Sequence, residues 1–196
     1  MKGDVTVAWP RVLGQEHIQD ILQRTLIQGR LAHSYLLIGP PGLGQEEIIN
    51  QLGSALSCHQ EVLEPCGHCV GCLAFAGGHP DFHQIAPIGA SIKIDQIREL
   101  ANSLALHPYI GPHRLCVVYD ADTLTMEAGN SFLKLLEEPG AGIIFILLTA
   151  NPAGLLPTIT SRCQSLLLQP VPLKYIEEEL ISQGIPQEQA QIAAAL

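Results

Sequence analysis

The chain has 196 residues, of which 47% are hydrophobic and 15% are charged. This composition excludes a wholly disordered chain, which would have fewer apolar residues and more charge. The formal net charge of −9 argues against a stand-alone nucleic-acid binder, because phosphate binding needs clustered Lys and Arg. No apolar run is long enough to span a bilayer, and the N-terminus MKGDVTVAWP lacks the apolar stretch of a signal peptide. We therefore expect a cytoplasmic globular protein with no membrane partner.

Apolar residues at helical spacing alternate along the chain with short apolar runs that are typical of buried parallel strands. The predicted helices cover residues 14–29, 45–57, 94–106 and 126–138, and the predicted strands cover 34–39, 82–87, 114–120, 142–150 and 163–169. Gly29 is the expected stop of the first helix, and Asp95 is the expected N-cap of the third. This alternation predicts an α/β fold in which helices cover both faces of a parallel sheet.

The pattern changes after Pro170 and Pro172. Residues 173–196 contain two helical patterns with Gly184 and Pro186 between them, and the chain stops inside the second pattern. We expect residues 1–170 to form the main domain. Residues 171–196 are expected to begin a small helical domain whose remainder is truncated.

The stretch GPPGLGQE has the glycine spacing of a phosphate-binding loop, with Gly39, Gly42 and Gly44 between a predicted strand and a predicted helix. In a working P-loop, backbone N–H groups hold the phosphates, a Lys contacts the outer phosphates and a Ser or Thr holds Mg²⁺. Gln45 stands at the Lys position here, and Glu46 puts a carboxylate at the Ser or Thr position, close to where phosphate would bind. We interpret the stretch as a degenerate P-loop that is not expected to bind ATP. The alternative is an ordinary Gly-Pro turn.

Four cysteines with the spacing C-x7-C-x2-C-x2-C interrupt the helix–strand pattern at residues 58–82: Cys58, Cys66, Cys69 and Cys72. Four thiolates make the usual tetrahedral structural zinc site, which leaves no open position for catalysis. Disulfides are disfavoured in a reducing compartment, and iron–sulfur ligation lacks a redox partner motif in this sequence. His68 could replace one of the cysteines. The sequence therefore predicts a structural zinc site made by the four cysteines.

Six motifs follow one another along the chain: HSYLLIGPPGLG, the cysteine cluster, SIKIDQIREL, GNSFLKLLEEPG, ILLTANP and LLPTITSRCQ. Together they resemble the bacterial clamp-loader family of AAA+ proteins over about residues 10–196. The resemblance implies an AAA+ RecA-like domain of the P-loop type at 1–170, with an inserted zinc module at 58–82. It also implies a helical lid domain that begins at 171, and a C-terminal collar domain that is absent from this chain.

The strand LCVVYDAD ends in acids, as does a Walker-B strand, whose Asp holds Mg²⁺ and is usually followed by a Glu that activates water. Counting back from Asn130 in the family motif N-x-x-L-K-x-L-E-E-P, the resemblance places Asp120 at the Glu position and Tyr119 at the Mg²⁺ Asp position. The Lys, Ser or Thr, and Asp positions therefore all depart from the active pattern, which implies a subunit that does not hydrolyse ATP. Thr149 and Asn151 lie where active relatives sense the γ-phosphate, and here they are expected to cap a loop.

The tripeptide Ser161-Arg162-Cys163 is unremarkable by itself, since an Arg after a loop is usually a surface residue. Clamp-loader relatives have the same SRC sequence, and the resemblance implies that Arg162 is an arginine finger. It would act in trans on the ATP of a neighbouring subunit, with Ser161 and Cys163 positioning it. Glu137 and Glu138 end a predicted helix and are expected to be solvated charges.

The resemblance implies the gamma/tau and delta subunits of the clamp loader as partners, and the sliding clamp and primed DNA through the assembled complex. The implied function is support of ATP-driven clamp loading in DNA replication, as a component of the DNA polymerase III holoenzyme. One alternative is an active gamma/tau-like ATPase motor, against which Gln45 and Glu46 argue. The other is a zinc-stabilised binding module with no loader role, against which the ordered run of motifs argues.

Overall fold

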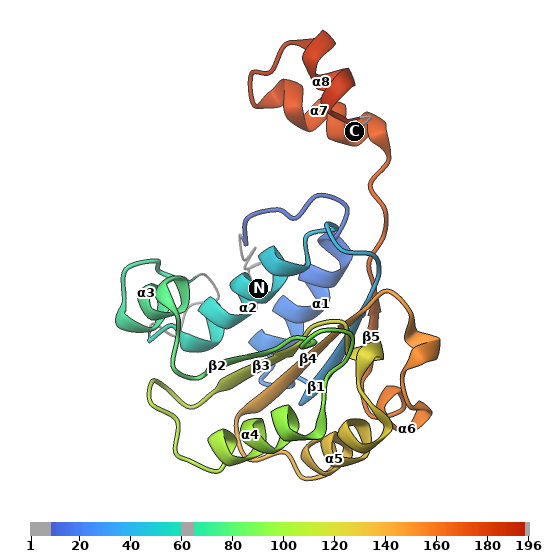
Figure 1. Ribbon diagram of the computed structural model, residues 1–196. Helices are drawn as coiled ribbons and strands as arrows, with labels where there is room; N and C mark the ends of the chain where they lie inside the picture. Colours follow the sequence, from blue (N-terminus) through green and yellow to red (C-terminus); the bar gives the residue numbers. More distant parts are fainter. Residues whose placement is uncertain (1–8, 60–64, 195–196) are drawn as a thin grey trace.

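A five-stranded parallel sheet organises the protein, with the strand order β2-β3-β4-β1-β5 (Figure 1). The computed structural model describes residues 9–59 and 65–194; residues 1–8, residues 60–64 of the predicted metal module and residues 195–196 of the predicted lid lie outside this description. The strands are β1 (Ser34–Ile38), β2 (Phe82–Ile85), β3 (Arg114–Val118), β4 (Ile143–Thr149) and β5 (Gln164–Leu167). Each corresponds to one strand predicted from the sequence, and the parallel α/β arrangement is confirmed.

The helices are α1 (Glu16–Ile27), α2 (Gln45–Ser57), α3 (Val70–Gly77), α4 (Ile94–Leu104), α5 (Met126–Glu137), α6 (Pro157–Thr160), α7 (Leu173–Ser182) and α8 (Gln187–Ala194), and 3₁₀ turns cover Ala121–Thr123 and Pro152–Gly154. Helices α2 to α6 lie in the connections between successive strands, as parallel pairing requires, whereas α1 precedes β1 and α7 and α8 follow β5. Helix α3 was not predicted, because it is short and rich in glycine. Gly29 lies two residues beyond α1 with φ of 61°, in the left-handed conformation expected of a helix stop.

Helices cover both faces of the sheet, with α1 and α2 on one face and α4 and α5 on the other (Figure 1). Successive side chains of a strand point to opposite faces. Leu37 of β1 accordingly packs in a cluster that contains Ile18 of α1 and Leu52 of α2. Leu36 packs in a second cluster, where Phe132 of α5 meets Phe145 of β4 edge to face with ring centroids 5.3 Å apart. The sheet is therefore buried on both sides.

The predicted N-cap of α4 is wrong. Helix α4 begins after Lys93, whose backbone N–H donates to Oε1 of Gln96 over 3.0 Å. Asp95 lies inside the first turn, where its carboxylate pairs with Arg98 at 3.1 Å. A carboxylate in the first turn still favours the helix through the helix dipole, but it does not cap the helix.

Helices α7 and α8 pack against each other at the end of an extended segment, away from the sheet (Figure 1). Ala190 and Ala194 of α8 are buried, whereas Leu173 and Tyr175 of α7 are more than half exposed. The division into a main domain at 1–170 and a lid that begins at 171 stays a prediction. Within the described ranges, no helix is both long enough and apolar enough to cross a membrane.

Candidate functional site

The stretch predicted to be a degenerate P-loop lies between the carboxyl end of β1 and the start of α2. Chain order and spatial order diverge at β1, whose neighbours are β4 and β5, and this is the place where open parallel sheets bind ligands. A cavity of about 200 Å³ lies here, and its lining includes Gly39, Gln45, Glu46, Tyr119 and Thr149. The structure thus brings the altered positions of the predicted nucleotide site together in one pocket.

Gly44 fixes the turn from the loop into α2. Its φ is 89°, and a Cβ at this position would lie 2.2 Å from Cγ1 of Val12. Both the left-handed backbone and the close approach of the N-terminal segment therefore require glycine. The loop geometry is maintained although the residues that follow have changed.

The side chain of Gln45 binds the loop itself. Its Oε1 accepts the backbone N–H of Leu43 over 2.9 Å, and its Nε2 donates to the carbonyl of Pro40 over 2.6 Å. Gln45 is only 8% exposed, so its carboxamide is part of the packed loop. A backbone N–H of the kind that holds phosphate in a working P-loop is thus already bonded within the chain.

Glu46 and Tyr119 contact each other across the pocket. The Tyr119 hydroxyl donates to Oε2 of Glu46 over 3.1 Å and accepts a hydrogen bond from Nε2 of Gln84 over 3.2 Å. Burial, followed by the charge of Glu46, raises the pKa of Tyr119 to about 12. The two side chains that stand at the predicted Mg²⁺-binding positions therefore bond to each other, and Tyr119 stays protonated at neutral pH.

Polar groups at the ends of β3 and β4 also bond within the chain. The Thr149 hydroxyl donates to Oδ1 of Asp122 over 2.6 Å and accepts the backbone N–H of Asn151 over 3.0 Å. Asp120 is the one non-glycine residue with positive φ in the described part of the chain, at 44°. Its left-handed backbone turns the chain directly after β3, and the Thr123 hydroxyl donates to its carbonyl over 2.7 Å.

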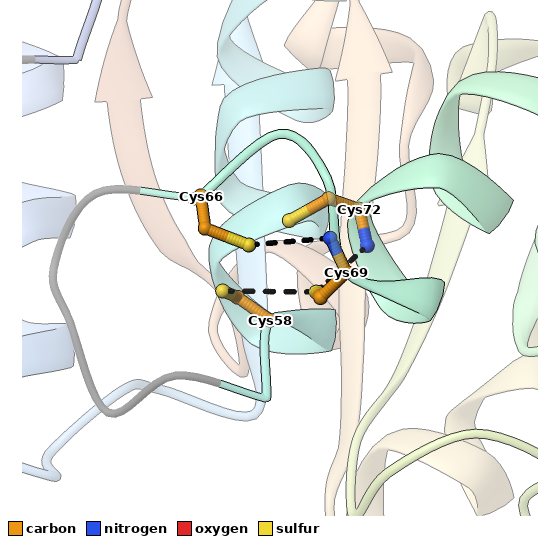
Figure 2. Close-up of side chains that lie close together, drawn as sticks. All are labelled: Cys58, Cys66, Cys69 and Cys72. Carbon is orange, nitrogen blue, oxygen red and sulfur yellow. Dashed lines mark hydrogen bonds between the residues drawn. The ribbon is translucent and has the colours of Figure 1, made fainter.

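The four predicted metal ligands converge (Figure 2). Their Sγ atoms all lie within 4.8 Å of one another, and those of Cys58 and Cys69 are 3.9 Å apart. A zinc ion with four Zn–S bonds of about 2.3 Å would place its sulfurs about 3.8 Å apart. The cluster thus has the donor type, donor number and spacing of a metal site, and it can hold a metal ion.

Two helix ends bring these cysteines together. Cys58 directly follows α2, and Cys69 is the N-cap of α3, where its sulfur accepts the Cys72 N–H at 3.5 Å. The Cys69 N–H in turn bonds to the Cys66 sulfur at 3.3 Å. A Cβ at Gly71 would lie 1.8 Å from the Ser57 carbonyl oxygen, so only glycine allows α3 to approach the end of α2 this closely.

The thiols of the cluster differ in acidity. The hydrogen bond from the Cys72 N–H is the largest cause that lowers the pKa of Cys69, to about 5. Burial raises the pKa of Cys72. The thiolate is the form that binds metal, so the lowered pKa of Cys69 favours metal binding, whereas burial of Cys72 opposes the loss of its proton.

Arg162 lies just before β5, and its guanidinium is held from two sides. Nη2 donates to Oε1 of Glu137 over 2.7 Å, and Nη1 donates to the carbonyl of Thr158 over 2.9 Å. The Arg162 side chain remains 36% exposed. Glu137, expected to be a solvated charge, is half exposed, and its carboxylate also forms an ion pair with Arg162.

The residues beside Arg162 have separate contacts. The Ser161 hydroxyl donates to the Thr158 carbonyl over 3.1 Å, so it shares an acceptor with the guanidinium. Cys163 packs against the core, and burial raises the pKa of its thiol. The Ser34 hydroxyl donates to the Arg162 carbonyl over 2.7 Å. Sequence reasoning did not connect Ser34 or Glu137 with Arg162, because only the fold brings these segments together. It also missed Thr158, which is four residues before Arg162 at helical spacing.

Arg162 and the pocket lie at opposite ends of β1. Ser34, which holds the Arg162 carbonyl, is the first residue of the strand, and the loop follows Ile38, the last residue. Four strand steps of about 3.3 Å separate these ends by about 13 Å. The arrangement is that of an AAA+ fold whose pocket side chains bond within the chain, and whose partly exposed Arg162 lies at the other end of β1.

The chain belongs to the family described as DNA polymerase III, delta subunit, whose model matches residues 14–172. It is 36% identical over 181 residues to the DNA polymerase III subunit delta′ of Bacillus subtilis, a match that covers 92% of this chain and 55% of that protein. It is also 35% identical over 156 residues to the B. subtilis tau subunit, covering 78% of this chain and 27% of tau. The chain therefore spans about half the length of the delta′ relative.

A solved structure supports the same fold. The DNA polymerase III gamma subunit-related protein of Thermotoga maritima superposes with a TM-score of 0.57 at 25% identity, covering 93% of this chain and 58% of the other. Identity to delta′ and identity to tau are nearly equal, so identity alone does not separate these two kinds of subunit. The two kinds of subunit have to be distinguished by the side chains in the pocket.

Proposed function

We propose that the chain is a non-hydrolysing clamp-loader subunit of the DNA polymerase III holoenzyme, of the delta′ kind. It would work in the cytoplasm with gamma/tau and delta subunits, and would meet the sliding clamp and primed DNA through the assembled complex. In this role it supports ATP-driven clamp loading during DNA replication. The observation that carries the proposal is the direct hydrogen bond between Glu46 and Tyr119, at the two positions where an active site would hold Mg²⁺.

The contacts in the pocket argue against ATP binding in three ways. Gln45 supplies no positive charge for the outer phosphates. Its Oε1 already accepts the backbone N–H of Leu43, which is therefore not free to bind phosphate. Glu46 adds a negative charge that repels phosphate. Mg²⁺ prefers carboxylate and water ligands in an octahedral arrangement, and a protonated Tyr119 offers no such ligand. Together these features support an empty or weakly occupied pocket, and they argue against the motor alternative.

The position of Arg162 supports a role in trans. The strand β1 separates the guanidinium from the chain's own pocket, so the two do not serve the same phosphate group. A guanidinium has five N–H donors, and its two contacts with Glu137 and Thr158 leave donors for a phosphoryl group of a neighbour. An arginine finger stabilises the negative charge of the phosphoryl-transfer transition state.

The proposed metal is zinc, held by Cys58, Cys66, Cys69 and Cys72. Four sulfur donors favour zinc, and the set leaves no position for water or substrate. Zinc in this position would join the end of α2 to the start of α3 and stabilise the module. None of its chemistry would enter the ATPase reaction.

The deciding experiment is an ATPase assay of the reconstituted loader with the Arg162→Ala variant. Arginine fingers contribute on the order of 10³-fold or more to turnover, so we expect turnover at the facing ATP site to be lost while ATP binding there continues. Arg98→Ala is the matched control, since Arg98 is also a partly exposed, ion-paired Arg. Unchanged ATPase in an assembled Arg162→Ala loader would refute the role of the finger.

A further inference from the structure

We propose that Glu137 is a positioning residue for Arg162, which holds the guanidinium in the orientation that meets the phosphate of a neighbouring subunit. This inference rests on the proposed role of Arg162. It adds a second residue of this chain to the reaction in trans, one that touches neither substrate nor nucleotide. The resemblance to clamp-loader sequences assigned no role to this carboxylate, and the ion pair indicates one.

The first support is geometric. Arg162 is fixed at three points from three elements: Glu137 of α5 binds Nη2 over 2.7 Å, Thr158 of α6 binds Nη1 over 2.9 Å, and Ser34 of β1 binds the backbone carbonyl over 2.7 Å. Anchoring both terminal nitrogens fixes the plane of the guanidinium, because the group is rigid and flat. Anchoring the carbonyl fixes where the side chain starts. The remaining N–H donors therefore point in a defined direction.

The second support is that a carboxylate at position 137 contributes little to the stability of the helix or of the fold. Glu137 is the last residue of α5, where a negative charge is disfavoured by the partial negative charge of the helix C-terminus. The side chains of Glu137 and Arg162 are 49% and 36% exposed, and ion pairs this exposed add little to folding stability. Helix stability and fold stability thus do not account for the pair.

Positioning does account for it. A free Arg side chain loses rotamer freedom when it binds a phosphate, and this loss opposes catalysis. A guanidinium already held by Glu137 has lost much of that freedom before the subunits meet. Glu137 acts on the orientation of the Arg, so its removal should lower turnover without changing how tightly the neighbour binds ATP.

Glu138 provides a matched control on the same helix end. It is exposed like Glu137, and among the described residues its carboxylate has no hydrogen bond or ion pair. The two residues are adjacent in the sequence, but only Glu137 contacts Arg162 in the described part of the chain. A comparison of their variants therefore isolates the contact from the general effect of charge near α5.

The test is the ATPase of the reconstituted loader as a function of ATP concentration. The free energy of an exposed ion pair corresponds to a rate change of up to about five-fold. We therefore expect Glu137→Ala to lower kcat about three- to five-fold and to leave KM for ATP unchanged. Glu137→Gln keeps the shape and an acceptor oxygen and should lose less. Glu138→Ala should match the unmodified loader. Glu137→Ala should cause no further loss when combined with Arg162→Ala, since the residue acts only through that Arg.

The outcomes separate this inference from the proposed function. If Arg162→Ala lowers turnover but Glu137→Ala does not, the positioning role is wrong and the finger stands. If Arg162→Ala has no effect, both are wrong. A higher kcat in Glu137→Ala would mean that Glu137 restrains the guanidinium, which contradicts positioning. A loss in Glu137→Ala that persists in the Arg162→Ala background would also contradict it, because the effect would then be structural.

Discussion

The polar side chains at the two ends of β1 differ in whether they bond within the chain or remain open to other molecules. At the carboxyl end, Gln45 bonds to the loop, and Glu46 bonds to Tyr119. At the amino end, Arg162 keeps a partly exposed guanidinium with unused donors. One end of the strand has satisfied its polar groups inside the chain, and the other end presents a charge to the outside.

The proposed function accounts for this difference as the loss of one function of a nucleotide-binding fold while another is kept. The sheet, the glycine loop and α2 remain, because they form the core and the turn that the fold requires. At the positions predicted to bind phosphate and metal, Gln45 bonds to the loop backbone, and Glu46 and Tyr119 bond to each other. A charge at the other end of β1 is independent of those contacts, since about 13 Å of strand separates the two ends.

The largest expected effect concerns the metal module, which shares α2 with the pocket. Zinc bound to peptides with structural sites contributes about 10–16 kcal/mol of binding free energy. We expect the unmodified chain to contain one zinc ion, and Cys66→Ser with Cys69→Ser to contain none and to lose amide protection in α3. Metal analysis and hydrogen exchange measure these two changes. The amides around Gln45, at the other end of α2, should keep their protection.

Cys163→Ala is the control for the metal measurement, because Cys163 is also a partly buried thiol but lies far from the cluster in sequence. It should keep a full complement of zinc. Loss of metal from Cys163→Ala, or retention of metal by the Cys66 and Cys69 double variant, would contradict the four-cysteine site. Loss of amide protection around Gln45 would show that the pocket depends on the metal. It would contradict the prediction that the two ends of α2 respond separately.

The next effect should come from rebuilding the pocket. A chain with Gln45→Lys, Glu46→Thr and Tyr119→Asp regains the three residue types of an active site and loses the Glu46–Tyr119 contact. We expect Mg-ATP to bind at least about tenfold more tightly, which corresponds to about 1.4 kcal/mol. Calorimetric titration measures the affinity. Gln45→Lys alone is the control, because it keeps the carboxylate that repels phosphate and should gain less.

Equal affinity of the rebuilt and unmodified chains would contradict the account of the pocket. It would mean that something other than these three side chains excludes nucleotide. A rebuilt chain that binds Mg-ATP but does not assemble with its partners would indicate a second role for the closed pocket.

The smallest effect is the titration of Tyr119. Its pKa in the folded chain is raised to about 12, above the ordinary value of about 10. The folded state therefore favours the protonated phenol. The stability that follows is complete below about pH 10 and is lost as the pH rises through about 12. Urea unfolding of the unmodified chain and of Tyr119→Phe should thus converge as the pH rises through this range.

Glu46→Gln refines that measurement. Burial is the larger cause of the shift and the charge of Glu46 is the second, so the variant should lower the pKa of Tyr119 without restoring its ordinary value. Ultraviolet difference titration against Tyr119→Phe reports this pKa. Glu47→Gln removes an adjacent exposed charge and should leave the titration unchanged. An unchanged titration in Glu46→Gln would show that the two side chains do not interact in solution.

The sequence predicted the elements of the fold well, because apolar periodicity is a local signal. The run GIIFILLTA was predicted to be the most apolar strand, and β4 is central in the sheet. The order of the strands is not local and did not follow from the pattern. Asp95 was misassigned because a carboxylate is favourable both as a cap and within the first turn, and the backbone alone distinguishes these positions.

The candidate site was predicted in its residues but not in its contacts. Spacing identified the loop and the four cysteines, since both depend on short sequence distances. The bond between Glu46 and Tyr119 joins residues 73 positions apart, and that between Glu137 and Arg162 joins residues 25 apart. Pairs of this kind form only when the strands assemble. No signal in the sequence distinguished Glu137 from Glu138.

The central claim is that this chain has no working nucleotide site and contributes an Arg to another. The most direct test is calorimetric titration of the purified chain with Mg-ATP, accompanied by a phosphate-release assay. We predict no saturable binding heat at millimolar ATP and no phosphate release. Stoichiometric binding with steady phosphate release by the isolated chain would contradict the claim.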